Sequence, residues 1–544
     1  MKPPRSGVAW LAAALFAFVC LASAPAASPG RAAEGDDLRP DAAWSEARQL
    51  SDAGRYDEAL GVIQTALAAH PGDTGLLWLE AGVTGWAGRH GESAALYERL
   101  LAAHPEMADD LRLDLARQRL YAGDTPGSLS ELTLHLMRHP ADRDALLLRA
   151  TALTYAQRFD DAEAVYGELL RAEPADPEAR RGLARALNWR GQHREAARIY
   201  AQLYDEGERD PEVVDGLAHA RYWSGRSDLA YRSMDDLLRA KPGDRSADRL
   251  AQDVAWERGP SLSADYDRAI DSDDLDLRTA RFDYRQPASP SDLLHATWSV
   301  HRAQDPTRYF RMERVGLGHE RLWSDSWETH ALLEYQYRGP TDAKHLLGDA
   351  YATFRPNDDW RFDFGAGHDQ VFAGQALELD IRTWTGSVGA DWRVNSRFGL
   401  SGAVRGLAYS DDNTGLRTSL LAQYRTPMPS LDVSMFLGFE QFAVSKPEIG
   451  NGYYAPAGYF ELTPGVELTY EHPSGFLAGG EVRFGVQKEQ GSDADPMTAA
   501  AARVELPVLR YLLLGARASY NDSNLALASG YSRDEWGLYL RTRF

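Results

Sequence analysis

The segment Trp256-Glu257-Arg258-Gly259-Pro260-Ser261-Leu262 separates two parts of the chain that have different hydrophobic periods. Upstream, an aromatic residue followed two positions later by a small or polar residue recurs every 34 or 35 residues. The recurring pairs are Trp86 with Gly88, Tyr121 with Gly123, Tyr155 with Gln157, Trp189 with Gly191, and Trp223 with Gly225. Downstream, apolar and polar residues alternate, in runs of about ten, to Phe544. A period near 34 is typical of stacked helical hairpins, and a period of two is typical of strands.

The upstream part fits the tetratricopeptide pattern, and we expect a solenoid over residues 40–258 with about six repeats and a closing helix. Small residues let the paired helices approach closely, and recurring prolines end the second helix of each unit. The structural positions are clearest in two matched sets: Gly182, Ala184, Trp189 and Gly191, then Gly216, Ala218, Trp223 and Gly225. We interpret the aromatic stripe as packing between adjacent units and the concave face as a partner-binding surface.

The downstream part, residues 259–544, predicts an antiparallel transmembrane β-barrel. Leu294, Ala296 and Trp298 alternate with His295 and Thr297, and other runs follow the same rule. A soluble sandwich could also alternate, but the runs repeatedly end in Trp, Tyr or Phe, as interfacial girdles require. Seven tight turns interleave with eight longer connections, which predicts about 16 strands, with fourteen or eighteen as alternatives.

The first residues have the features of a secretory signal peptide. Lys2 and Arg5 give a basic start, an apolar stretch follows, and Ala22-Ser23-Ala24 is a small-residue cleavage site. We therefore expect a signal peptide over 1–24 and a flexible linker over 25–39, with an uncleaved anchor as the alternative. Cleavage after Ala24 would remove Cys20, the single cysteine, and would exclude disulfides and a cysteine nucleophile.

The net charge of −21 argues against nucleic acid as a partner, because phosphates require a basic surface. An even number of strands places both ends of a barrel on the side of the short turns, which is the periplasm in outer-membrane barrels. We therefore expect a protein of the Gram-negative outer membrane with its repeats in the periplasm. Sixteen strands leave an aqueous lumen. The longer connections are short, so we expect none to fold inward as a large plug, which favours a conduit for an extended polymer.

The repeat wording Gly-Leu-Ala-x4-Trp-x-Gly, at Gly182 to Gly191 and Gly216 to Gly225, followed by a terminal barrel, resembles a known exporter architecture. The chain is similar to the PgaA-type poly-β-1,6-N-acetylglucosamine export porins and to the YaiO-type outer-membrane barrels. The cellulose-secretion component BcsC has a similar layout with more repeats. The resemblance implies export of an exopolysaccharide of the biofilm matrix. This chain is shorter and has fewer repeats than a full-length exporter of this type, which affects the expected set of partners.

Inward-facing carboxylates are the candidate polymer contacts, because a partly de-N-acetylated glucosamine polymer carries positive charge and many weak sites would let it slide. The candidates are Glu461, Glu467, Glu471, Asp363, Glu334, Asp265 and Asp267. Glu461, Glu467 and Glu471 share one expected strand and form the first-choice patch. The alternative is that lumen charges pair across strands and only hydrate the pore.

The sequence contains no nucleophile motif and no metal-binding pair of histidines on a helix, so we expect neither an enzyme nor a cofactor or metal. The expected partners are the exported polysaccharide, the lipid membrane, a periplasmic polymer-modifying enzyme or scaffold protein, and the barrel assembly machinery through Phe544. The leading hypothesis is a secretion porin. The rivals are a barrel-anchored repeat scaffold that assembles envelope or surface components without conducting, and a general porin with an accessory domain.

Overall fold

The computed structural model describes residues 41–544, apart from 273, 340, 429, 448, 449, 473 and 524–531. The fold class predicted from the sequence is confirmed: a helical, tetratricopeptide-like region is followed by a closed antiparallel barrel of 16 strands. The expected signal peptide and linker lie outside the described residues. Contacts divide the described chain into two units, residues 41–190 and residues 191–544. Within the described helices, none is long and apolar enough to span a membrane.

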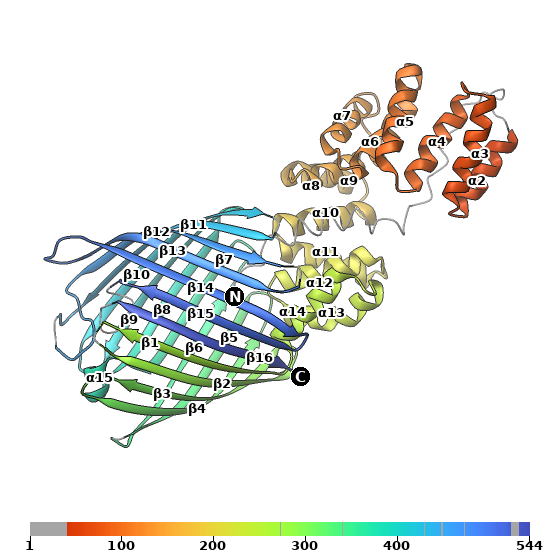
Figure 1. The fold of residues 1–544 in the computed structure, drawn as a ribbon. Coiled ribbons are helices and arrows are strands. Elements are labelled where there is room, and N and C mark those ends of the chain that lie inside the picture. Colours follow the sequence, from red (N-terminus) through yellow and green to blue (C-terminus); the bar gives the residue numbers. More distant parts are fainter. Residues whose placement is uncertain are drawn as a thin grey trace. The chain divides into compact units, whose positions relative to one another are not determined.

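Helices follow one another at the repeat period throughout the first part of the chain (Figure 1). The first unit contains α2 (Asp41–Asp52), α3 (Tyr56–Ala69), α4 (Thr74–Trp86), α5 (His90–Ala103), the 3₁₀ turn η1 (Pro105–Met107), α6 (Ala108–Tyr121), α7 (Thr125–Leu136), α8 (Arg143–Tyr155), α9 (Phe159–Ala172) and α10 (Pro177–Arg190). The second unit begins with α11 (His193–Asp205), α12 (Pro211–Trp223), α13 (Ser227–Ala240) and α14 (Arg245–Arg258). The change from helix to strand lies between Arg258 and Ser261.

Turn and capping residues recur with the repeat for a local reason. The turn residue after the aromatic takes a left-handed conformation, with φ of 78° at Gly88, 96° at Gly191 and 84° at Gly225. Glycine adopts this region without steric cost, so it recurs there. Aspartates cap helix starts: the Asp142 carboxylate accepts from the Ala145 N–H at 3.1 Å.

The small residues of the repeat motif lie where helices touch. A side chain at Gly182 would come within 2.5 Å of the Tyr166 ring, and one at Gly216 within 2.4 Å of the Tyr200 ring. Ala184 and Ala218 are fully buried. The aromatic stripe packs between consecutive repeats as well. The ring centroids of Tyr155 and Trp189 are 5.6 Å apart, and those of His193 and Trp223 are 5.4 Å apart. These contacts explain the two kinds of motif residue: small residues stand where helices touch closely, and aromatic residues fill the space between repeats.

Sixteen strands close into one barrel by pairing of the first strand with the last. They are β1 (Ser261–Asp271), β2 (Asp276–Ser289), β3 (Asp292–Gln304), β4 (Tyr309–Leu322), β5 (Trp327–Gly339), β6 (Ala343–Phe354), β7 (Trp360–Gln370), β8 (Arg382–Arg393), β9 (Phe398–Tyr409), β10 (Thr414–Met428), β11 (Leu431–Val444), β12 (Tyr459–Glu471), β13 (Leu477–Glu489), β14 (Asp495–Leu509), β15 (Leu512–Asn521) and β16 (Arg533–Arg543). Each strand pairs antiparallel with its sequence neighbours. A short helix, α15 (Gly374–Glu378), lies between β7 and β8.

The barrel presents apolar side chains outward and polar side chains to its lumen. Leu317, Phe484 and Leu538 are 72%, 62% and 56% exposed on the outer face. On the inner face of β12, Glu461 and Thr463 alternate with the outward Leu462. A closed barrel with this outward apolar surface satisfies every strand hydrogen bond and has the character of outer-membrane barrels.

Candidate functional site: the lumen and the two ends of the barrel

All seven carboxylates predicted to line the lumen lie on inward positions of their strands. The register gives this directly: Asp265 is opposite Tyr539, Asp267 is opposite Gly537, and Glu334 is opposite Gly316. Strand pairing keeps a residue and its partner on the same face of a sheet. The period-two alternation is therefore sufficient to assign the faces.

At least four of these seven carboxylates form ion pairs with described residues. Glu334 lies 3.4 Å from Arg314, Asp363 lies 2.9 Å from Arg361, and Asp267 lies 2.6 Å from Arg517. Glu471 pairs with Arg249 of α14. For these positions the structure favours the alternative interpretation, in which lumen charges pair across the wall. Paired carboxylates attract a cationic polymer less than free ones do.

Glu461, Glu467 and Glu471 do not form one patch. They are six and four residues apart on β12, which corresponds to about 20 Å and about 13 Å along the strand. Glu461 is only 6% exposed and accepts a hydrogen bond from the Tyr459 hydroxyl at 2.9 Å. Glu471 lies at the short-turn end. Glu467, between them, lines a cavity. The expected cluster is instead a line of three separate carboxylates.

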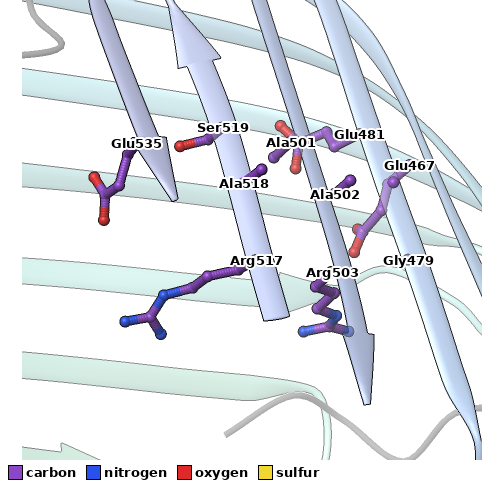
Figure 2. Close-up of a pocket in the computed structure, with 11 residues that line it drawn as sticks. Glu467, Gly479, Glu481, Ala501, Ala502, Arg503, Arg517, Ala518, Ser519 and Glu535 are labelled. Atoms are coloured by element: carbon purple, nitrogen blue, oxygen red, sulfur yellow. The ribbon is translucent and has the colours of Figure 1, made fainter. Parts of the chain in front are cut away.

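The cavity that includes Glu467 lies on the inner wall of β12 to β16 and has a volume of about 320 Å³ (Figure 2). Its floor is made of small residues, Ala501 and Ser519, which face each other across β14 and β15. In Figure 2, Arg503 and Arg517 form the next pair along the same two strands, and Glu535 lies at the edge of the cavity. The depression therefore presents both charges around a flat base, which suits a hydroxyl-rich ligand better than a simple polycation.

No connection was expected to fold inward as a large plug, but the connection between β7 and β8, residues 371–381, does fold into the lumen. We call this segment the lumen loop. Its Leu377 packs in one cluster with Ala303 and Phe310 on the inner wall of β3 and β4. Its Val371 packs in another with Phe442 on the inner wall of β11. These two walls lie far apart around the barrel, so the lumen loop spans the interior at the end of the longer connections.

Polar contacts fix the lumen loop as well. Arg338, which is 2% exposed on β5, donates through Nη1 to the Leu377 carbonyl oxygen at 2.6 Å. The same Nη1 lies 2.9 Å from Asp380 Oδ1. On the other side, Gln375 donates to the Gly450 carbonyl oxygen at 2.9 Å. The expectation rests on loop length, whereas the sequence signal for burial is the set of apolar residues in this segment, such as Val371, Leu377 and Ile381.

Helices α11 and α13 and the residue Gly191 contact the short-turn end of the barrel, opposite the lumen loop. The Arg194 backbone N–H donates to Asp358 in the β6–β7 turn at 3.0 Å. Arg393 at the end of β8 donates to the Gly191 carbonyl oxygen at 2.7 Å. The Ser291 hydroxyl in the β2–β3 turn donates to Asp228 of α13 at 3.0 Å. The second unit therefore joins the last repeats to the short-turn rim.

Helix α14 lies across this mouth. Arg258 Nη1 is 3.2 Å from Glu320 on the inner face of β4, and Arg249 pairs with Glu471 on β12. Arg543 on β16 lies over the Trp256 ring at 5.5 Å. In a closed barrel of 16 strands, β4 and β12 are on opposite walls and β16 is midway between them. A helix that touches all three crosses the opening. Sequence analysis placed this helix but gave no sign of its contacts.

Burial shifts the ionisation of groups at this joint. Burial, with a smaller contribution from the Arg393 guanidinium, lowers the pKa of His193 to about 3. Burial also raises the pKa of Glu257 on α14 above its usual value, and the nearby Glu320 and Glu328 add to this. Both shifts favour the neutral form, because a buried charge loses its hydration.

Comparisons with known proteins describe the two parts separately. A Tetratricopeptide repeat family model matches residues 153–214, and no curated protein matches the chain significantly. Among solved structures, the chain is similar to a "Bacterial polysaccharide outer membrane secretin", with 13% identity over 53% of this chain and 99% of that one, at a TM-score of 0.44. It is also similar to PilW, a "widely conserved type IV pilus biogenesis factor", with 17% identity over 38% of this chain and 96% of that one, at a TM-score of 0.34.

A third similar structure is CdiB from Acinetobacter baumannii, with 7% identity over 52% of this chain and 60% of that one, at a TM-score of 0.35. At these identities and scores none of the solved structures carries a functional argument. The repeat match and the strand topology together define the molecule: residues 42–258 are a tetratricopeptide-like region, and a closed 16-stranded barrel follows.

Proposed function

We propose that the chain is an outer-membrane porin of the PgaA or YaiO type. It exports an exopolysaccharide of the biofilm matrix, most simply a poly-N-acetylglucosamine-like polymer. It acts as a conduit and performs no catalysis. The barrel provides the path through the membrane, and the repeats on the periplasmic side receive the polymer or dock its modifying enzyme or scaffold.

The observation that carries this proposal is the joint between α14 and the short-turn mouth. Short turns face the periplasm in outer-membrane barrels. Because α11, α13 and α14 contact this end of the barrel, a polymer bound by the repeats would be delivered directly to the lumen entrance. The contacts of Arg249 and Arg258 with opposite walls support a resting state in which that entrance is covered.

The lumen supports the same proposal. Its wall carries positive and negative side chains in pairs. Arg417 on β10, for example, forms an ion pair with Glu440 on the neighbouring strand β11. Such a wall is wet and holds no net attraction strong enough to trap a chain, which conduction of a polymer requires. Recognition of Phe544, whose side chain is 74% exposed, by the barrel assembly machinery is part of the same proposal.

Export is tested by deletion. A strain that lacks this chain is expected to lose matrix polymer outside the cell and to retain it in the periplasm. Complementation with the barrel alone, residues 259–544 behind a signal peptide, measures the contribution of the repeats. Full export by the deletion strain would refute the proposal.

The alternative is a barrel-anchored scaffold that does not conduct, and the lumen loop is the observation that favours it. Leu377 and Val371 close the interior with apolar contacts on two walls. Purified protein in a planar bilayer separates the two functions. A porin is expected to show openings while the lumen loop is in place, whereas a scaffold is expected to stay silent until the loop is removed.

A further inference from the structure

A second cavity opens on the lumen wall formed by strands β2 to β7, away from the one in Figure 2. Its volume is about 380 Å³. Its polar lining includes Asp283, His295, Arg314, His330, Asp349 and Tyr351. A cavity of this size is large enough for a sugar unit and lies within the usual range for small-molecule sites.

Buried polar atoms in this cavity have no hydrogen-bond partner among the described residues. His295 is 5% exposed, its Nδ1 is 3.6 Å from Asp283 Oδ1, and its Nε2 is 3.8 Å from Glu320 Oε2. Both distances are within ion-pair range but exceed hydrogen-bond length, so His295 Nε2 and Asp283 Oδ1 make no hydrogen bond among the described residues. His330 Nδ1, 3.5 Å from Asp349 Oδ2, is in the same state. Groups buried in this way normally have a partner, so they point to a ligand with hydroxyl or amide groups.

An aromatic surface lies beside these atoms. Tyr351 is 51% exposed although it is on the inner face of β6, opposite Gly365. Its ring stacks on His330 with centroids 5.8 Å apart, and His330 meets His295 edge to face at 5.7 Å. A flat, open ring next to unpartnered polar atoms is the combination that contacts both the apolar face and the hydroxyl edge of a pyranose.

The charges around the cavity are mixed and closely spaced. Arg281 and Arg285 flank Asp283 on β2, and Arg314 is already bound to Gln336 at 2.8 Å and to Asp369 at 2.8 Å. A polycation would meet guanidinium groups here, and a polyanion would meet carboxylates. A neutral amide avoids both problems, since its N–H donates to a carboxylate and its carbonyl accepts from a guanidinium.

We propose that this cavity is a binding subsite for one uncharged, N-acetylated sugar unit of the exported polymer. This inference rests on the proposed function and names the substrate chemistry of the same lumen. The subsite is close to the entrance, because Glu320, which lies beside His295, also binds Arg258 of α14. The subsite would therefore bind the first sugar unit of the polymer that moves past α14 into the lumen. De-N-acetylated units would bind elsewhere or pass without holding.

The test measures binding of three soluble tetramers to the full-length chain in detergent: N-acetylglucosamine, glucosamine and glucose. The N-acetylglucosamine tetramer is expected to bind several-fold more tightly than the others. Tyr351→Ala should weaken it about tenfold because the stacking surface is lost, and Tyr351→Phe should retain it. Tyr511→Ala, in the β14–β15 turn, is the matched control. Heat-modifiable migration on a gel checks that each variant is folded.

The outcomes separate the subsite from the export function. Absence of binding, equal binding of the glucosamine tetramer, or binding that is insensitive to both Tyr351→Ala and Asp283→Asn would overturn the subsite. The deletion strain reports on export independently. Selective binding together with unaltered export by that strain would keep the sugar site and refute the conduit.

Discussion

At the end of the longer connections, the lumen loop buries Val371 and Leu377 against two walls, whereas at the short-turn end helix α14 reaches opposite walls through Arg249 and Arg258. The closure by the lumen loop, which we call the outer closure, is mainly apolar. The closure by α14, which we call the inner closure, is ionic. Apolar contacts carry no charge that can titrate or be screened, whereas charged contacts weaken with salt and respond to pH. The difference suggests that the inner closure yields to an approaching charged partner and that the outer closure yields only when the loop is displaced.

Removing the outer closure should give the largest effect. Replacing residues 373–380 by three glycines is expected to raise single-channel conductance by roughly tenfold, because 16 strands leave an aqueous channel once the loop is gone. Planar-bilayer recording checks this. Leu379→Ala, at an exposed position of the same loop, should leave conductance unchanged. An unaltered conductance after the replacement would mean that the loop does not close the lumen.

Loosening the outer closure without shortening it is a second way to test the comparison. Arg338→Met removes the bond to the Leu377 carbonyl and leaves Asp380 without this buried partner. Asp380 keeps His345 as a partner at 3.0 Å, so the main cost is the lost hydrogen bond to the Leu377 carbonyl oxygen, about 1–3 kcal/mol. We expect frequent brief openings in bilayers and greater protease sensitivity within residues 371–381. Arg311→Met, at an exposed position of β4, serves as the control.

The inner closure is tested by Arg258→Gln. Its guanidinium is buried and lies between Ser227 and Glu320, so its loss is expected to weaken α14 docking by about 2–3 kcal/mol. Hydrogen exchange over Arg245–Arg258 should then accelerate, while exchange in the barrel strands stays slow. Arg245→Gln, at the exposed start of the same helix, is the matched control. Equal protection of α14 in both variants would show that Arg258 does not hold it.

The smallest effect is expected from acid. The pKa of His193 is about 3 in the folded chain, below its unfolded value of 6.5, so the folded state binds fewer protons. Stability contributed by neutral His193 is complete above pH 6.5 and is lost as pH falls toward 3. Between pH 6.5 and pH 5 the loss is about 2 kcal/mol. Thermal unfolding against pH measures it, and His193→Phe should flatten the profile in this window. A wild-type profile that is already flat there would contradict the assignment.

Local patterns were sufficient wherever a residue's role depends on near neighbours in sequence. Alternation placed Asp265, Glu334 and Glu467 in the lumen because successive strand residues face opposite sides. The repeat period located Gly191 and Gly225 because each needs a left-handed turn. Length alone misjudged residues 371–381, since their burial depends on Phe310 and Phe442, which are far away in the chain.

The sequence by itself determined a repeat solenoid, a barrel of about 16 strands and the face on which each strand residue lies. All three follow from hydrogen bonding and periodicity within a few residues or between adjacent strands. Only the tertiary structure decided that lumen carboxylates pair with arginines, that the lumen loop crosses the interior, and that α14 covers the entrance. These contacts join residues such as Arg249 and Glu471, which closure of the barrel brings together and which no local pattern relates.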